Sequence, residues 1–107
     1  MTTPQQVIRA YMFKRGYAKS KHYYGAAQLA REIGEDSKYI AGYINGNVQV
    51  SQRILKNIAK QLGINAKRLL LLDRVIRGVA PKEEFGEAME YFEKDLNGYV
   101  AYVEDTK

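Results

Sequence analysis

Glycines end most of the segments of helical periodicity in this sequence, and this punctuation limits the chain to a set of short helices. Apolar residues recur at spacings of three and four before Gly34, Gly46, Gly63 and Gly78. Such spacing puts apolar side chains on one face of a helix, and glycine tolerates the positive φ that often closes one. The sequence therefore predicts a mainly α-helical protein whose short helices must pack on one another.

The start of each predicted helix has its own signal. Pro4 suits the first turn of a helix that ends near Gly16, and Ala26 to Ile33 carries the apolar pattern of a second. The third, fourth and fifth helices are expected to begin after the side-chain caps Asp36, Ser51 and Asn65. We expect these five helices to form one domain over residues 1–80.

The chain changes character after Pro81. An acidic amphipathic helix is predicted by Phe85, Ala88, Met89, Phe92 and Leu96, and strand-forming residues follow from Tyr99 to Val103. A lone strand leaves backbone groups unpaired, so this end is either a disordered tail or pairs with a second copy across a two-fold axis. We favour pairing, with residues 81–107 as a helix-strand dimerisation segment. Its expected apolar contacts are Phe85, Met89, Phe92, Tyr99 and Tyr102.

Charge is divided unevenly between these two parts. Residues 1–80 hold 14 lysines and arginines against four acidic residues, whereas residues 81–107 hold three lysines against eight acidic residues. A basic body favours a polyanionic partner such as nucleic acid, although mild basicity alone also serves solubility. The acidic segment is expected to stay away from that partner.

Several classes of function have no support in the sequence. The chain has no cysteine, and its one histidine, His22, has no carboxylate pair nearby for a metal site or a catalytic triad. No apolar run approaches the roughly 20 residues that cross a bilayer, and MTTPQQVIR lacks the apolar core of a secretory signal. We expect a cytoplasmic protein with no enzymatic activity, metal, cofactor or membrane contact, and no small-molecule ligand is evident.

The stretch LAREIGEDSKYIAGYINGN, residues 29–47, carries the functional signal. Two short helical patterns meet at Gly34, and the second opens with the polar residues Ser37 and Lys38. A helix, a glycine-bearing turn and a second helix form a helix-turn-helix unit. In that unit the first residues of the second helix reach base edges in the DNA major groove, which explains polar residues there.

The same residues resemble the phage-repressor and Cro-type family, also called the xenobiotic-response-element family. Leu29-Ala30 before the turn glycine, Ile40 six positions after it and Gly46 at the end of the second helix follow the family pattern. A serine-capped helix that ends in AKQLG and a hydrophobic pair follow, here from Ser51 to Leu70. The resemblance implies a five-helix, lambda-repressor-like domain that binds double-stranded DNA, usually as a homodimer on a palindromic operator.

The resemblance also implies roles for individual residues. The base-reading positions would be Ser37, Lys38, Tyr39, Ala41 and Gly42. Phosphates would be approached from the start of the second helix and the end of the third, by Ala26, Gln28, Asn45 and Asn47. Three positions depart from the family pattern, because long polar residues are common at 26 and 42 and glutamate at 44, where this chain has Ala26, Gly42 and Ile44. Base readout would then lean on Lys38, which can donate to guanine, and on Tyr39 or Ala41 against a thymine methyl.

The connector between the first two helices is basic and aromatic. KRGYAKSKHYY brings together Lys14, Arg15, Lys19 and Lys21, with Tyr17, Tyr23 or Tyr24 as hydroxyl donors. It can be interpreted as a phosphate clamp beside the motif or as a solvated loop, and we favour the clamp because the following helix braces the DNA backbone.

Taken together, these features predict a small sequence-specific transcriptional regulator, a phage or bacterial repressor that excludes polymerase by occupancy. The alternative is an antitoxin-like interaction module whose C-terminal segment masks a partner protein. A stable homodimer in the absence of other proteins would favour the first hypothesis.

Overall fold

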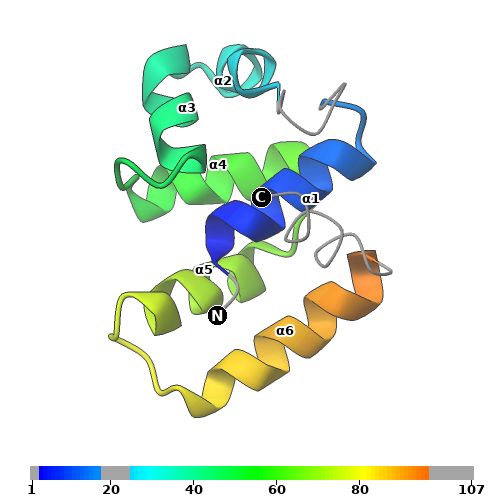
Figure 1. Cartoon of the computed structure of the whole chain (residues 1–107), viewed down its shortest axis with the longest axis vertical. Coiled ribbons are helices and arrows are strands. Elements are labelled where there is room, and N and C mark those ends of the chain that lie inside the picture. The colour runs from blue at the N-terminus through cyan, green and yellow to red at the C-terminus, as the bar shows by residue number, and fades with distance from the viewer. Residues whose placement is uncertain (1–2, 18–24, 97–107) are drawn as a thin grey trace.

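The computed structural model describes residues 3–17 and 25–96, and its described part is built from helices (Figure 1). These helices are α1 (Pro4–Lys14), α2 (Ala26–Ile33), α3 (Ser37–Ile44), α4 (Gln52–Leu62), α5 (Ala66–Ile76) and α6 (Glu83–Leu96). The mainly helical class is confirmed. The predicted strand from Tyr99 to Val103 lies outside the described residues, as do Lys19, Lys21, His22, Tyr23 and Tyr24.

Local side-chain caps set the helix boundaries, as predicted. Asp36 accepts hydrogen bonds from the backbone N–H groups of Lys38 and Tyr39, at 2.7 and 3.1 Å. Ser51 and Asn65 each accept one from the third residue beyond them, at 3.3 and 3.1 Å. Each such cap stabilises a helix by about 1 kcal/mol. The structure also shows a cap that was not predicted. Thr3, ahead of Pro4, forms a reciprocal capping box with Gln6.

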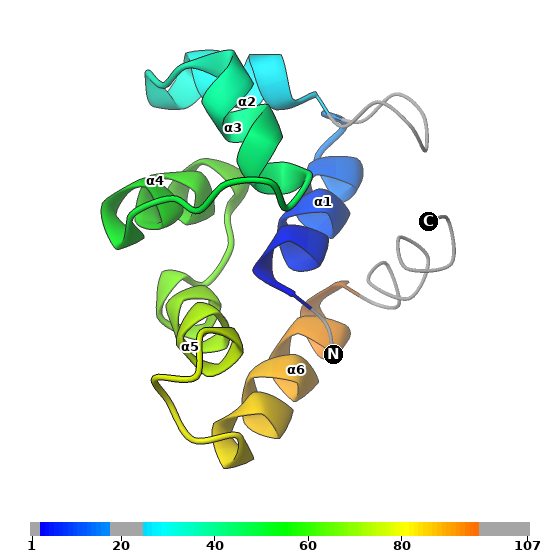
Figure 2. The same cartoon turned by 60° about the vertical axis from the view of Figure 1, so that its left-hand side comes forward.

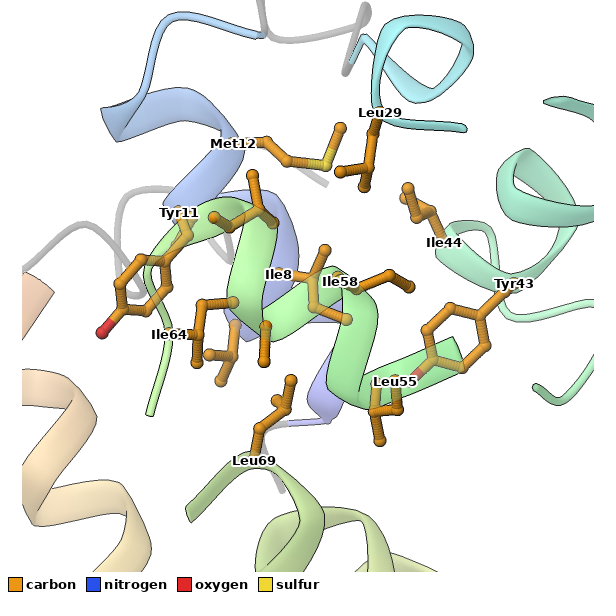
Figure 3. Close-up of a cluster of buried hydrophobic side chains, with 14 of the residues drawn as sticks. Ile8, Tyr11, Met12, Leu29, Tyr43, Ile44, Leu55, Ile58, Ile64 and Leu69 are labelled. Carbon is orange, nitrogen blue, oxygen red and sulfur yellow. The ribbon is translucent and has the colours of Figure 1, made fainter. Parts of the chain in front are cut away.

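The core forms around α1 and α4, which run through the middle of the molecule (Figure 1). Ile8 and Met12 of α1, Leu29 of α2, Ile44 of α3 and Ile58 of α4 are at most 1% exposed. Figure 3 shows these side chains converging with others from α4 and α5. Burying one side chain of this size stabilises the fold by about 1.5–3 kcal/mol, so this shared core is what holds α2 and α3 in place.

Helix α6 belongs to the same core, which corrects one expectation. Its Phe92 is fully buried and meets the ring of Tyr11 edge-on, with centroids 6.3 Å apart at 84°. Met89 is 8% exposed, and Phe85 is partly buried against the same core. We expected Phe85, Met89 and Phe92 to form a dimer interface. They instead cover their own chain, because an apolar stripe on a helix buries against the nearest apolar surface.

Polar contacts fix the last turn of α6 to α1. The hydroxyl of Tyr11 donates to a carboxylate oxygen of Asp95, and Nζ of Lys14 donates to the backbone oxygen of Asp95 at 2.9 Å. Burial raises the pKa of Tyr11, and the neighbouring carboxylate raises it further, so this phenol stays protonated and remains a donor. The described part of the predicted dimerisation segment therefore packs against α1 and α5, and hydrogen bonds join it to α1.

Candidate nucleic-acid interface

The helix-turn-helix unit lies at one end of the molecule, where α2 and α3 pack against each other (Figure 2). Gly34 closes α2 with a φ of 73°, and its N–H group and that of Glu35 bond back to Arg31 and Ala30. This left-handed residue turns the chain sharply enough for Asp36 to cap α3 two residues later. The turn was predicted from the glycine, and its geometry sets the angle at which α3 leaves α2.

Helix α3 has one buried face and one open face. Ile40, Tyr43 and Ile44 are at most 1% exposed, and they anchor the helix to the core. Ser37 and Lys38, in the first turn, are exposed. Because Asp36 accepts from the backbone N–H groups of Lys38 and Tyr39, neither Ser37 nor Lys38 is needed to cap the helix. This is where a recognition helix presents its base-reading groups.

The other predicted base-reading residues differ in their access to solvent. Ala41 and Gly42 are partly exposed on the open face. Tyr39 is partly buried against the core, and its hydroxyl donates to the backbone oxygen of Gln49 at 3.0 Å. We expected Tyr39 to read a base. Its hydroxyl ties α3 to the connection that follows, and its base-reading role stays a prediction.

The residues expected near phosphates from the motif itself are accessible. Gln28, Asn45 and Asn47 are exposed, and Ala26 is partly exposed at the start of α2. That helix begins after Gly25, which offers no side chain to bond the first N–H groups. Unbonded amides at a helix N-terminus favour an anion. Gly25 cannot readily be replaced, because an added Cβ would lie 2.4 Å from the backbone oxygen of Tyr17.

The basic residues at the end of α1, which belong to the predicted clamp, are exposed and bond to the ends of two other helices. Arg15 donates from Nε to the backbone oxygen of Leu62 at 3.1 Å, at the end of α4. Lys14 is bound to Asp95 at the end of α6, as described above. Cations suit helix C-termini because the last carbonyl groups carry partial negative charge. Figure 1 shows this end of α1 beside the end of α6, with α3 on the other side of the view.

A hydrogen-bond network on the surface of α2 was not predicted. The hydroxyl of Tyr17 donates to Glu32, and Nε2 of Gln61 donates to the same carboxylate oxygen at 3.1 Å. The hydrogen bond from Tyr17 holds the pKa of Glu32 below its usual range, while burial raises the pKa of Tyr17. Tyr17 was a candidate phosphate donor, but it is 8% exposed and this bond occupies its hydroxyl. The network joins α2 to α4 and braces the first helix of the motif.

A second unpredicted contact fixes the connection between α3 and α4. Asp73 is buried and pairs with Nε of Arg77 at 3.0 Å. The Nη2 group of Arg77 then donates to the backbone oxygen of Val50 at 3.0 Å and to Gln49 Oε1 at 3.3 Å. The spacing of Asp73 and Arg77 is a signal for a helical ion pair. The contact with the connection at Val50 could not be predicted, because Asp73 and Arg77 lie far from Val50 in the sequence.

No helix among residues 3–17 and 25–96 combines the length and apolar character needed to cross a membrane. Within the same ranges, His, Asp and Glu side chains form no group of three or more that could hold a metal ion.

Comparison with known families agrees with this geometry. A family model described as helix-turn-helix matches residues 26–69, which run from the start of α2 into α5. These residues form a helix-turn-helix domain of the phage-repressor and Cro type, so the resemblance drawn from the sequence is confirmed over this range. The family is one of DNA-binding regulators and not of enzymes. No curated protein and no solved structure matches the chain.

Proposed function

We propose that this protein is a sequence-specific repressor of phage or bacterial type that binds a palindromic operator as a homodimer. The observation that carries the proposal is the exposure of Ser37 and Lys38 in the capped first turn of α3, inside a segment that matches the helix-turn-helix family. The start of α2 braces the DNA backbone, and α3 lies in the major groove. Repression follows from occupancy, because a bound dimer covers the promoter.

Lys38 is the residue on which base reading depends most. Its ammonium group donates to O6 and N7 of a guanine, and a good base contact contributes roughly 1–3 kcal/mol of discrimination. Lys38→Ala should therefore weaken binding to the operator by roughly 5- to 150-fold and binding to random DNA much less. Lys67→Ala is the matched control, since Lys67 is exposed on α5 beside α6. Equal losses on both DNAs would show that Lys38 contacts only phosphate.

Dimerisation is assigned to the residues beyond α6. Tyr99 and Tyr102, in the segment expected to pair with its copy, remain the candidate contacts after Phe85, Met89 and Phe92 are found in the core. The deletion that tests this must retain α6, so it removes only residues 97–107. Sedimentation at micromolar concentration should show a dimer for the full chain and a monomer for the shortened one. A shortened chain that still dimerises would place the interface elsewhere, with exposed Ile76 and Val79 as the first candidates.

Selection of bound duplexes from a random pool tests the function as a whole. The expected result is a palindrome whose half-sites have centres about 34 Å apart, one turn of DNA. Failure to enrich any sequence, with binding that depends only on salt, would contradict sequence-specific regulation. If the chain does not dimerise by itself and forms a stable complex only with another protein, the antitoxin-like alternative is favoured.

A further inference from the structure

Val48 is an exposed apolar side chain in a polar connection. The residue is 40% exposed, and its neighbours Asn45, Gly46, Asn47 and Gln49 are exposed and carry no apolar side chain. A single exposed valine needs no explanation by itself. Its position relative to α3 is what distinguishes this one.

The path of the chain after α3 brings Val48 back onto the open face of that helix. Gly46 has a φ of 81°, and its N–H group bonds to the oxygen of Tyr43 at 2.9 Å. The N–H group of Asn47 bonds to the oxygen of Gly42 at 2.8 Å. This pair of bonds is the Schellman arrangement, which reverses the chain at a helix end. Figure 2 shows the connection turning back below α3 on its way to α4.

Val48 occupies the space that a side chain at position 42 would enter. A Cβ atom placed on Gly42 would lie 3.2 Å from Cγ2 of Val48 and 3.8 Å from Cγ1. Gly42 is one helical turn beyond Lys38, so the two positions are neighbours on the surface of α3. The methyl groups of Val48 therefore lie beside the residue expected to read a base, at a place where the recognition helix has no side chain of its own.

Contacts on the C-terminal side of Val48 fix it in this position. The next residue, Gln49, accepts a hydrogen bond from the hydroxyl of Tyr39 at 3.0 Å. The one after it, Val50, is buried and accepts a hydrogen bond from Arg77 at 3.0 Å. A side chain on an anchored backbone loses little conformational entropy when it binds, so an apolar contact made by Val48 would keep most of its value.

We propose that Val48 is a specificity-determining residue that contacts the 5-methyl group of a thymine next to the base pair read by Lys38. The inference rests on the proposed function, because it assumes that α3 lies in the major groove. In that groove the thymine methyl is the apolar group available to a valine. Val48 thus takes the role of the side chain that Gly42 lacks, and a residue outside the recognition helix contributes to its reading surface.

The test compares thymine with uracil, which lacks only the 5-methyl group. Duplexes selected from the random pool are remade with single uracil substitutions, and their affinities for the full-length protein are measured. At one position in each half-site the wild type should lose roughly fourfold, the value of burying one methyl group. Val48→Ala should bind the thymine duplex more weakly by a similar factor and should lose nothing further with uracil. Val79→Ala, which changes another exposed valine, should behave as the wild type does.

A second variant guards against an effect of Val48→Ala on the loop itself. Val48→Thr keeps the shape of the side chain and replaces one methyl group with a hydroxyl, so its sensitivity to uracil should be smaller than that of the wild type. The proposal is overturned if uracil weakens Val48→Ala as much as the wild type at every position, or if Val48→Ala binds as tightly as Val79→Ala. If the pool yields no preferred sequence, the proposed function has failed and this inference fails with it.

Discussion

Replacing Phe92 with alanine tests whether α6 is part of the domain core or a surface reserved for a second copy. Phe92 is fully buried and meets Tyr11 edge-on, so the substitution removes a whole ring from a packed site. Deleting a buried aromatic ring costs about 3–5 kcal/mol. A domain of this size is stable by about 5–15 kcal/mol, so the loss is a large part of the total.

Urea denaturation followed by circular dichroism gives the free energy of unfolding. Phe92→Ala should lower it by about 3 kcal/mol or more, which corresponds to a fall in Tm of at least about 12 °C. Glu93→Ala changes the exposed neighbour on the same helix and should alter the free energy by less than about 0.5 kcal/mol. The difference between the two variants isolates burial from any general effect on α6.

Protein concentration separates the two roles of Phe92. A substitution in the core destabilises each chain equally at every protein concentration, whereas a substitution in a dimer interface has a larger effect where the dimer is populated. The reasoning would be refuted if Phe92→Ala matched Glu93→Ala in dilute protein and lost stability only when concentrated. In that event α6 would cover a partner chain and not α1.

Three further predictions concern the polar contacts. Arg15→Met should lower the free energy of unfolding by about 1 kcal/mol, since it removes the hydrogen bond to Leu62. The same substitution should leave the salt dependence of DNA binding unchanged. If the slope of log affinity against log salt falls by about one, Arg15 contacts a phosphate. The hydrogen bond from Tyr17 lowers the pKa of Glu32, so it stabilises the fold above pH 4.5, the ordinary pKa of glutamate. That stabilisation is lost as pH falls through the pKa of Glu32 in the folded protein. The wild type should therefore be more stable than Tyr17→Phe at neutral pH and lose this difference in acid. An acid titration with parallel curves for the two proteins would contradict this. Asp36→Ala should cost about 1 kcal/mol in thermal unfolding, because two N–H groups of α3 lose their acceptor, and an unchanged Tm would show that the cap contributes nothing.

The sequence predicted those parts of the fold that local chemistry decides. Asp36 caps α3 through atoms two and three residues away, so a short window of sequence was sufficient to find it. The same holds for Gly34, whose positive φ depends on the turn around it. The helix-turn-helix motif lies wholly in such local features, which is why α2 and α3 and their exposed first residues could be predicted.

Contacts between distant segments could not be predicted in the same way. The charge of Lys14 and Arg15 favoured a phosphate role, but their partners are carbonyl groups at the ends of α6 and α4, whose positions depend on the packed fold. The apolar stripe of α6 showed that Phe92 would be buried. It did not show whether the covering surface belongs to the same chain, because one amphipathic pattern fits both.

The exposed face of α3 shows the same division. The base-reading roles of Ser37 and Lys38 are predictions from their places in the motif, whereas Gly42 looked like a vacant position. Val48 fills that position only because Gly46 reverses the chain, and no spacing rule along the sequence links residues 42 and 48. The hydrogen bond from Tyr39 to Gln49 was not predicted either, because it depends on where the connection runs.

The most direct test of the account is the change in backbone amide NMR signals when a selected duplex is added to the protein. If α3 reads the major groove, the largest changes should fall at the start of α2, residues 26–28, and from Ser37 to Val48. Signals from Glu87 to Asp95 of α6 should stay in place. Changes concentrated on α6, with Ser37 and Lys38 unaffected, would contradict the claim that the open face of α3 meets DNA.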